Sequence, residues 1–226
     1  MEMVEAKTKT VVELQNAVMN TFSELIESRD GVTGGHIGRT QEYLRILLEE
    51  MQTHTLYSQQ IKSWDKALLL QSAQLHDVGK IAIRDSILQK PGKLAADEYE
   101  LIKSHVSFGE KIIDNIMSNT SDQIFLEQAK IMVSTHHEKW DGSGYPKRLK
   151  GSEIPLQGRM MAIVDVYDAL VSDRPYKKAF SHEEVVGIIA AGKGTQFDPD
   201  LVEIFMAAND RFKTITAQGG TPNILL

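Results

Sequence analysis

The segment on which the fold and the site depend is HHEKWDGSGYP, residues 136–146. Two adjacent imidazoles lead directly into two glycines, a tyrosine and a proline. A helix does not tolerate Gly-Ser-Gly-Tyr-Pro, because glycine loses conformational freedom there and proline lacks an amide donor. We therefore expect His136 and His137 at a helix end and the remaining residues in a shaped loop. The histidines are then expected to bind a reactive group, with the loop forming a pocket beside it.

Composition limits the classes of protein that this chain can represent. It has 226 residues, of which 42% are hydrophobic and 25% are charged, and this is typical of a globular domain. No apolar run is long enough to cross a membrane and no signal pattern opens the chain, so no membrane partner is expected. The absence of cysteine fits a cytoplasmic protein and leaves only His, Asp and Glu as metal ligands.

Charge argues against DNA or RNA as a partner, because the net charge of −6 would repel a phosphate backbone. The region from Glu138 to Lys178 nevertheless carries more basic than acidic residues. A compact anionic ligand would explain this local excess, although solvated lysines on a surface loop would look the same.

Apolar residues recur at helical spacing along the chain, and no strand-like alternation is present, so we predict an all-α domain. The first predicted helix, residues 9–28, carries an apolar stripe that could pack on the domain, pair with a second copy, or do both: Val11, Leu14, Val18, Phe22 and Leu25. A second helix is expected to start at His36, and a third to cover residues 59–76. Further helices are predicted over residues 97–105, 108–116 (with Ile112, Ile113 and Ile116 inward), 122–137, 154–172, from the capping box at Ser181–Glu184, and 198–209.

Five of the seven histidines occupy notable positions, and two aspartates accompany them: His36, His76, His105, His136, His137, Asp77 and Asp165. Any one histidine is more often an ordinary core or surface residue. The set is harder to explain in that way, because His-Asp and His-His doublets plus an aspartate in the apolar run AIVDV are what a cysteine-free two-metal site requires. Two ions about 3.5–4 Å apart can hold a hydroxide nucleophile and clamp a phosphate. Mixed nitrogen and oxygen ligands favour iron or manganese over tetrahedral zinc.

Lys80 follows His76 by four residues, which is one helical turn if the helix continues. There it could neutralise charge that develops on a phosphate, although an ordinary lysine at a helix end is also plausible.

These residues resemble the HD-domain metal-dependent phosphohydrolases. The composite of His76-Asp77-Val78-Gly79-Lys80, Lys90-Pro91-Gly92-Lys93-Leu94, the segment 136–146 and Ser172-Asp173-Arg174-Pro175-Tyr176 resembles the HD-GYP branch, the bacterial cyclic-di-GMP phosphodiesterases. The resemblance covers roughly Asp30 to Phe205. It implies an HD-domain-like helical bundle over residues 30–212, preceded by an amphipathic helix in residues 1–29 that links or dimerises, and followed by a loose tail in residues 213–226.

The resemblance also implies roles for individual residues. One metal would be held by His36, His76, Asp77 and Asp165, and the other by Asp77, His105, His136 and His137, with Asp77 bridging the two. Lys80 matches a lysine near the scissile phosphate, and the substrate would be contacted by Tyr145, Asp168, Arg174 and Lys177. Asp165 and Asp168 are three residues apart on one helix, which fits a shared face. Arg174 and Lys177 have a simpler reading as solvated loop charges. Some members bind a third metal through a glutamate four residues before the first ligand histidine; Val32 stands there, so two metals are expected. Glu138 is expected to orient a ligand histidine.

The function that these expectations favour is hydrolysis of cyclic-di-GMP to pGpG, with GMP as the product of a second cleavage. The alternatives are a phosphodiesterase for cyclic GMP-AMP, and a non-catalytic module that binds a cyclic dinucleotide or a diguanylate cyclase. Retention of every expected ligand favours the enzyme. A general nucleotide phosphohydrolase would not need the Gly-Tyr-Pro loop. The first helix resembles the segment that follows a sensory or receiver domain in this family, so such a domain upstream, or a homodimer through this helix, is expected.

Overall fold

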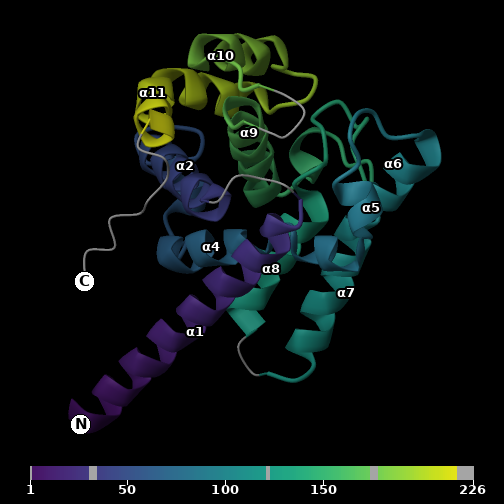
Figure 1. Ribbon diagram of the computed structural model, residues 1–226. Helices are drawn as coiled ribbons and strands as arrows, with labels where there is room; N and C mark the ends of the chain where they lie inside the picture. Colours follow the sequence, from purple (N-terminus) through teal and green to yellow (C-terminus); the bar gives the residue numbers. More distant parts are fainter. Residues whose placement is uncertain (1, 31–34, 121–122, 174–177, 218–226) are drawn as a thin grey trace.

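The computed structural model describes residues 2–30, 35–120, 123–173 and 178–217, with the side chains of residues 2–9 and 12 excepted. The protein is about 71% helical and, over the described residues, contains no strand beyond one isolated bridge between Lys193 and Phe197. The predicted all-α class is confirmed (Figure 1). In chain order the helices are α1 (Glu2–Ser28), α2 (His36–Met51), α3 (Ser58–Ile61), α4 (Lys66–Ser72), η1 (Ala73–Leu75), η2 (Val78–Ala82), α5 (Asp85–Leu88), α6 (Ala96–Lys103), α7 (His105–Met117), α8 (Gln123–Thr135), η3 (Gly151–Glu153), α9 (Leu156–Val171), α10 (His182–Ala191) and α11 (Pro199–Ala217).

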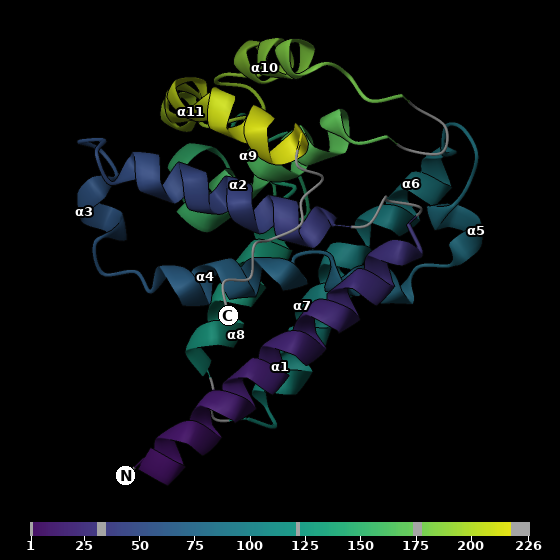
Figure 2. The same ribbon diagram turned by 60° about the vertical axis from the view of Figure 1, so that its left-hand side comes forward.

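The main core forms where α2, α9 and α11 pack together, with α10 closing one side (Figures 1 and 2). Tyr43 of α2 is fully buried there and stacks on Phe212 of α11, with ring centroids 4.7 Å apart. A smaller core joins η1, α7 and α8 around Leu75, Ile113 and Val133. The two cores hold α2, η1, η2, α7, α8 and α9 in fixed positions, and the site residues project from these helices.

The N-terminal helix α1 packs differently from the prediction. Val11, Leu14, Val18 and Leu25 are each about 60% exposed, so the stripe does not pack on the domain. The opposite face is buried instead, through Ser23, Ile26 and Glu27 near the C-terminal end. Both views show the N-terminal half of α1 extending away from the body of the protein (Figures 1 and 2). Helical spacing identified the stripe correctly as one face, but spacing cannot distinguish a face that packs on the domain from one left free.

Three other expectations need correction. The segment 59–76 is broken, because Asp65 accepts a hydrogen bond from the Leu68 amide (3.0 Å) and starts α4 as a new helix. Ile116 is 41% exposed rather than inward. The helix α11 continues to Ala217, and Thr216 Oγ1 lies 2.9 Å from the Tyr43 hydroxyl, so residues 213–217 are part of the domain rather than of a loose tail.

Among the helices of the described segments, none combines the length and the apolar composition that crossing a bilayer requires.

Candidate metal centre

The structure brings the seven predicted metal ligands together in two adjacent clusters. His36, His76 and Asp165 form one, and Asp77, His105, His136 and His137 form the other; within each cluster one ligand atom per residue lies within 4.8 Å of all the others. These residues come from the start of α2, the η1–η2 junction, the start of α7, the end of α8 and the middle of α9. Sequence spacing does not unite them; the packing of these helices does.

Asp77 lies between the two clusters and faces both. Its Oδ2 is 3.4 Å from His76 Nε2, whereas its Oδ1 is 3.2 Å from His105 Nε2 and 3.6 Å from His136 Nε2. Because each oxygen addresses a different cluster, this carboxylate has the geometry of a bridging ligand.

The ligand histidines are held so that Nε2 points into the centre. The Nδ1 atom of His76 donates to Ala73 O (2.9 Å), that of His105 to Ile102 O (2.7 Å) and that of His136 to Met132 O (2.9 Å). A backbone acceptor on Nδ1 fixes the neutral tautomer in which Nε2 carries the free lone pair. The backbone carbonyls therefore orient Nε2 of three imidazoles into the centre.

Polar atoms left without partners in this centre show that the donor set fits metal ions. His76 Nε2 and Asp77 Oδ1 are buried and have no hydrogen-bond partner. Leaving such atoms unsatisfied is costly, and cations would satisfy them. Burial, with His136 and His105 beside it, holds the pKa of His137 well below its usual value, which keeps this imidazole neutral. Burial acts to lower the pKa of His76, but the Asp77 charge outweighs it and raises the pKa to about 9. A cation there would compete with this proton.

Lys80 is fixed beside the bridging carboxylate. Its Nζ lies 2.8 Å from Asp77 Oδ2 and 2.5 Å from Asp30 Oδ2, just after α1. Burial disfavours the charged amine, yet Asp77 and Asp30 together raise the pKa of Lys80, so the amine stays protonated. Lys80 thus presents a fixed positive charge at the edge of the centre.

Asp168 requires a correction, because the structure places it behind a ligand rather than in front of a substrate. It is fully buried, and its Oδ2 accepts a hydrogen bond from His36 Nδ1 (2.7 Å). Arg39 donates to both carboxylate oxygens, at 2.6 and 2.9 Å. Burial alone would raise the pKa of Asp168, but Arg39 and His36 lower it. Asp168 therefore orients His36, and the helix face shared with Asp165 is used for the metal centre and its support.

Two residues of the centre were missed from the sequence. One is Arg39, which holds Asp168 from one turn beyond His36. The other is Glu27 of α1, whose Oε1 lies 3.4 Å from His36 Nε2 and has no hydrogen-bond partner. Burial raises the pKa of Glu27 to about 7. No pattern in the sequence marks Glu27 as a site residue, because its burial depends on which face of α1 packs on the domain.

The loop 139–149 forms a wall beside the second cluster. Tyr145 stacks on His137, with ring centroids 4.7 Å apart, and its amide donates to His137 O (3.2 Å). Glu138 is buried and accepts hydrogen bonds from the amides of Lys147 (2.7 Å) and Leu149 (3.1 Å). Glu138 thus fixes the loop, and the expectation that it orients a ligand histidine is not supported by these contacts. At Gly144 a Cβ atom would lie 2.3 Å from the Lys139 amide nitrogen, so a glycine is needed for the loop to close on itself.

An open cavity of about 680 Å³ lies against this loop, between it and α6–α7. Tyr145 brings the cavity next to His137, and Ser104 brings it next to His105. Lys103 Nζ lies 5.4 Å from the Tyr99 ring centroid and 5.6 Å from that of Tyr145. The lining is Tyr99, Glu100, Lys103, Ser104, Ser107, Gly142, Ser143, Gly144, Tyr145, Pro146 and Arg148. Aromatic faces and cations are the groups that bind bases and phosphates. No motif or spacing in the sequence singled out Tyr99, Lys103 or Arg148.

Arg174 and Lys177, predicted to contact substrate, and Val32, on which the two-metal expectation depended, lie outside the described residues.

A model of the HD domain matches residues 20–201. The chain belongs to the HD domain family. The HD-GYP assignment predicted from the motifs is confirmed, since the curated relatives of this HD domain include several cyclic di-GMP phosphodiesterases. One, from Vibrio cholerae serotype O1, is 45% identical over 217 residues, covering 96% of this chain and 44% of that protein.

Two further relatives differ in their named substrate or architecture. A 3'3'-cGAMP-specific phosphodiesterase 2 of Vibrio cholerae is 40% identical over 205 residues, covering 91% of this chain and 37% of that protein. The cyclic di-GMP phosphodiesterase response regulator RpfG of Xanthomonas campestris is 33% identical over 216 residues, covering 96% and 54%. The HD domain described here thus spans about half, or less, of the length of these relatives.

A solved structure, that of the cyclic GMP-AMP specific phosphodiesterase V-cGAP3 of Vibrio cholerae, matches with a TM-score of 0.56 and 19% identity, covering 88% of this chain and 50% of that one. At this identity the likeness supports the fold alone.

Proposed function

We propose that this HD domain is a metal-dependent phosphodiesterase that hydrolyses cyclic-di-GMP to pGpG, with GMP as the product of a second cleavage. The observation that carries the proposal is the pair of clusters with Asp77 between them, next to a cavity lined by tyrosines and cations. The relatives named cyclic di-GMP phosphodiesterases support it.

His36, His76, Asp77 and Asp165 would hold one ion, and Asp77, His105, His136 and His137 the other. Two bound divalent ions would supply Lewis-acid stabilisation to the phosphodiester and make water nucleophilic at neutral pH. The nitrogen and oxygen donors favour iron or manganese.

Side chains of the protein would stabilise the charge on the phosphate and bind the bases. Lys80, held by Asp30 and Asp77, supplies a fixed positive charge against the charge that develops on phosphate. Tyr145 offers a ring face to a base, and Lys103 adds a cation over that face. We keep Arg174 and Lys177 as proposed substrate contacts that follow the motif resemblance.

The choice between cyclic-di-GMP and cyclic GMP-AMP rests on a modest difference. Relatives of both specificities match, and the one with 45% identity is named for cyclic-di-GMP, whereas the first named for cyclic GMP-AMP has 40%. We therefore propose cyclic-di-GMP as the preferred substrate.

The exposed stripe of α1 is proposed to pair with a second copy. Alternatively, α1 is proposed to link this domain to an upstream receiver or sensory domain. We propose a cytoplasmic location from the absence of cysteine.

The test is hydrolysis by protein loaded with iron or manganese without oxygen, given cyclic-di-GMP and cyclic GMP-AMP in parallel, with the products identified by mass. Faster conversion of cyclic-di-GMP to pGpG is expected, together with loss of activity and metal in the variant carrying His76→Ala and Asp77→Ala. Binding of either dinucleotide without cleavage by the loaded protein would favour a receptor instead.

A further inference from the structure

The carboxylate of Glu27 is the group at this centre for which the predicted ligand set leaves no role. It lies on the last turn of α1, only 7% of the residue is exposed, and its Oε1 has no hydrogen-bond partner. Burying a carboxylate oxygen without a partner is expensive, and proteins do so mainly where a ligand completes the site.

The neighbour that Glu27 faces is a predicted metal ligand on the atom that would bind the metal. Glu27 Oε1 lies 3.4 Å from His36 Nε2, and the other nitrogen of His36 is already engaged by Asp168. Two ligands at right angles, each about 2.1 Å from an ion, lie about 3 Å apart. The distance between Glu27 Oε1 and His36 Nε2 therefore fits two neighbouring ligands of one cation.

We propose that Glu27 is a further protein ligand of the ion held by His36, His76 and Asp165, supplied by the N-terminal helix. The proposal rests on the metal centre proposed above and adds an oxygen ligand to it. Glu27 would be the third carboxylate ligand of this ion, after Asp77 and Asp165. It would raise the coordination number beyond four, which suits iron or manganese more than zinc.

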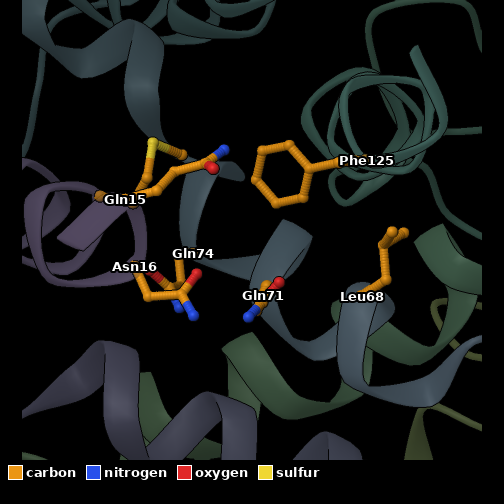
Figure 3. A pocket seen from close by; sticks show the side chains of 7 residues that line it. Gln15, Asn16, Leu68, Gln71, Gln74 and Phe125 are labelled. Atoms are coloured by element: carbon orange, nitrogen blue, oxygen red, sulfur yellow. The ribbon is translucent and has the colours of Figure 1, made fainter. Parts of the chain in front are cut away.

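Ligation by Glu27 would connect metal binding to the position of α1. Near Glu27, the helix end is fastened through Arg29, which donates to Ile81 O (3.0 Å), Ile83 O (2.9 Å) and Asp85 (2.7 Å). Further toward the N-terminus, α1 faces a cavity of about 180 Å³ lined by Gln15, Asn16, Met19, Leu68, Gln71, Gln74 and Phe125 (Figure 3). Figure 3 shows both amide side chains and the apolar side chains of Leu68 and Phe125 around this space.

A helix that packs over a cavity is held less firmly than one in a close-packed core. The metal would then fix the C-terminal end of α1 in place. Displacement of α1 would in turn lower the affinity for the metal, because metal binding and helix docking are linked equilibria.

The experiment compares metal binding to the metal-free chain in wild type, Glu27→Gln and Glu24→Gln. Glu24 is exposed and lies one turn earlier on the same helix, so it controls for loss of a charge on α1. Manganese titration followed by calorimetry, and metal content after desalting, should show two ions in wild type and in Glu24→Gln. Glu27→Gln should bind one ion about 10–100-fold more weakly and the other unchanged. Amide exchange across residues 20–28 should slow with metal in wild type and less so in Glu27→Gln.

Equal affinity for both ions in wild type and Glu27→Gln would overturn the Glu27 ligand and leave the centre intact. Altered stability of metal-free Glu27→Gln with unchanged affinity would do the same, showing that Glu27 is only an ion-pair partner of His36. Wild type that binds no ion would instead overturn the centre itself. If Glu27→Gln fails to fold, Glu27→Asp serves in its place; the shorter side chain should likewise lose affinity at one ion only.

Discussion

At the scale of single residues, hydrogen bonds to Nδ1 orient the histidines that are proposed to bind metal. Of the five ligand histidines, three have Nδ1 on a backbone carbonyl and His36 has it on Asp168, which Arg39 holds in turn. Ligand choice and ligand orientation are thus separate tasks carried by different residues. Mutations of the residues that orient these histidines should therefore change the affinity for metal rather than the affinity for substrate.

Asp168→Asn tests that distinction. Losing the charged acceptor should loosen His36 and weaken one metal site about 10–100-fold, as measured by metal titration of the stripped protein. The KM for cyclic-di-GMP, measured at saturating metal, should change little. Full metal affinity with a raised KM would show that Asp168 contacts substrate after all.

The pH dependence of the metal-free protein follows from His76. Its folded pKa, about 9, lies above the value of 6.5 for a free histidine, so the protonated form stabilises the fold. This contribution is fully present below pH 6.5 and is lost as pH rises through 9, an effect on the order of 3 kcal/mol. Urea unfolding with chelator should show wild type losing stability relative to His76→Gln across that window. Metal affinity should rise over the same window, because the ion needs the neutral imidazole. A stability difference that is independent of pH would contradict this account.

At the scale of secondary-structure elements, close approaches between helices place the ligands. Gly79 of η2 lies against α7 so tightly that a Cβ atom would fall 1.8 Å from His105 O and 2.5 Å from the Gly109 amide nitrogen. This contact sets the distance between Asp77 and His105. The motif residue Gly79 is thus a spacer between two ligands.

Gly79→Ala should destabilise the protein by roughly 3 kcal/mol or more, because α7 must move away from η2. Gly187→Ala is the matched control, since nothing lies within 4 Å of its added Cβ. That change within α10 should stabilise by about 0.5–1 kcal/mol. Thermal and urea unfolding measure both, and a Gly79→Ala variant as stable as wild type would refute the spacer role.

The conformation of the loop 139–149 depends on the hydrogen bonds that Glu138 accepts from it, so Glu138→Gln should loosen residues 145–149. We expect KM for cyclic-di-GMP to rise several-fold with metal content retained, since the loop walls the cavity but does not hold the ions. Glu153→Gln is the control, because Glu153 also accepts a backbone amide, that of Lys150, from an exposed position. Loss of metal in Glu138→Gln would instead support the earlier expectation that Glu138 orients a ligand histidine.

At the scale of the whole molecule, the class and the ligand list were predictable, but the supporting contacts were not. Helical spacing and the His-Asp and His-His doublets identified an all-α fold and seven residues that the structure brings together. Glu27, Arg39 and the role of Asp168 were missed, because they depend on which face of α1 packs and on which side of His36 the α9 helix lies. Those are tertiary facts, and a period of 3.6 residues does not contain them. The stripe of α1 was identified correctly as one face, but its packing on the domain was wrong for the same reason, and its pairing with a second copy stays a prediction.

The central claim is that two ions share Asp77 between the two clusters. Crystals of the manganese-loaded protein, measured on both sides of the manganese absorption edge, test this directly through anomalous difference maps. We predict two peaks about 3.5–4 Å apart, one among His36, His76 and Asp165 and the other among His105, His136 and His137, with Asp77 between them. A single peak, or two peaks that Asp77 does not join, would contradict the account.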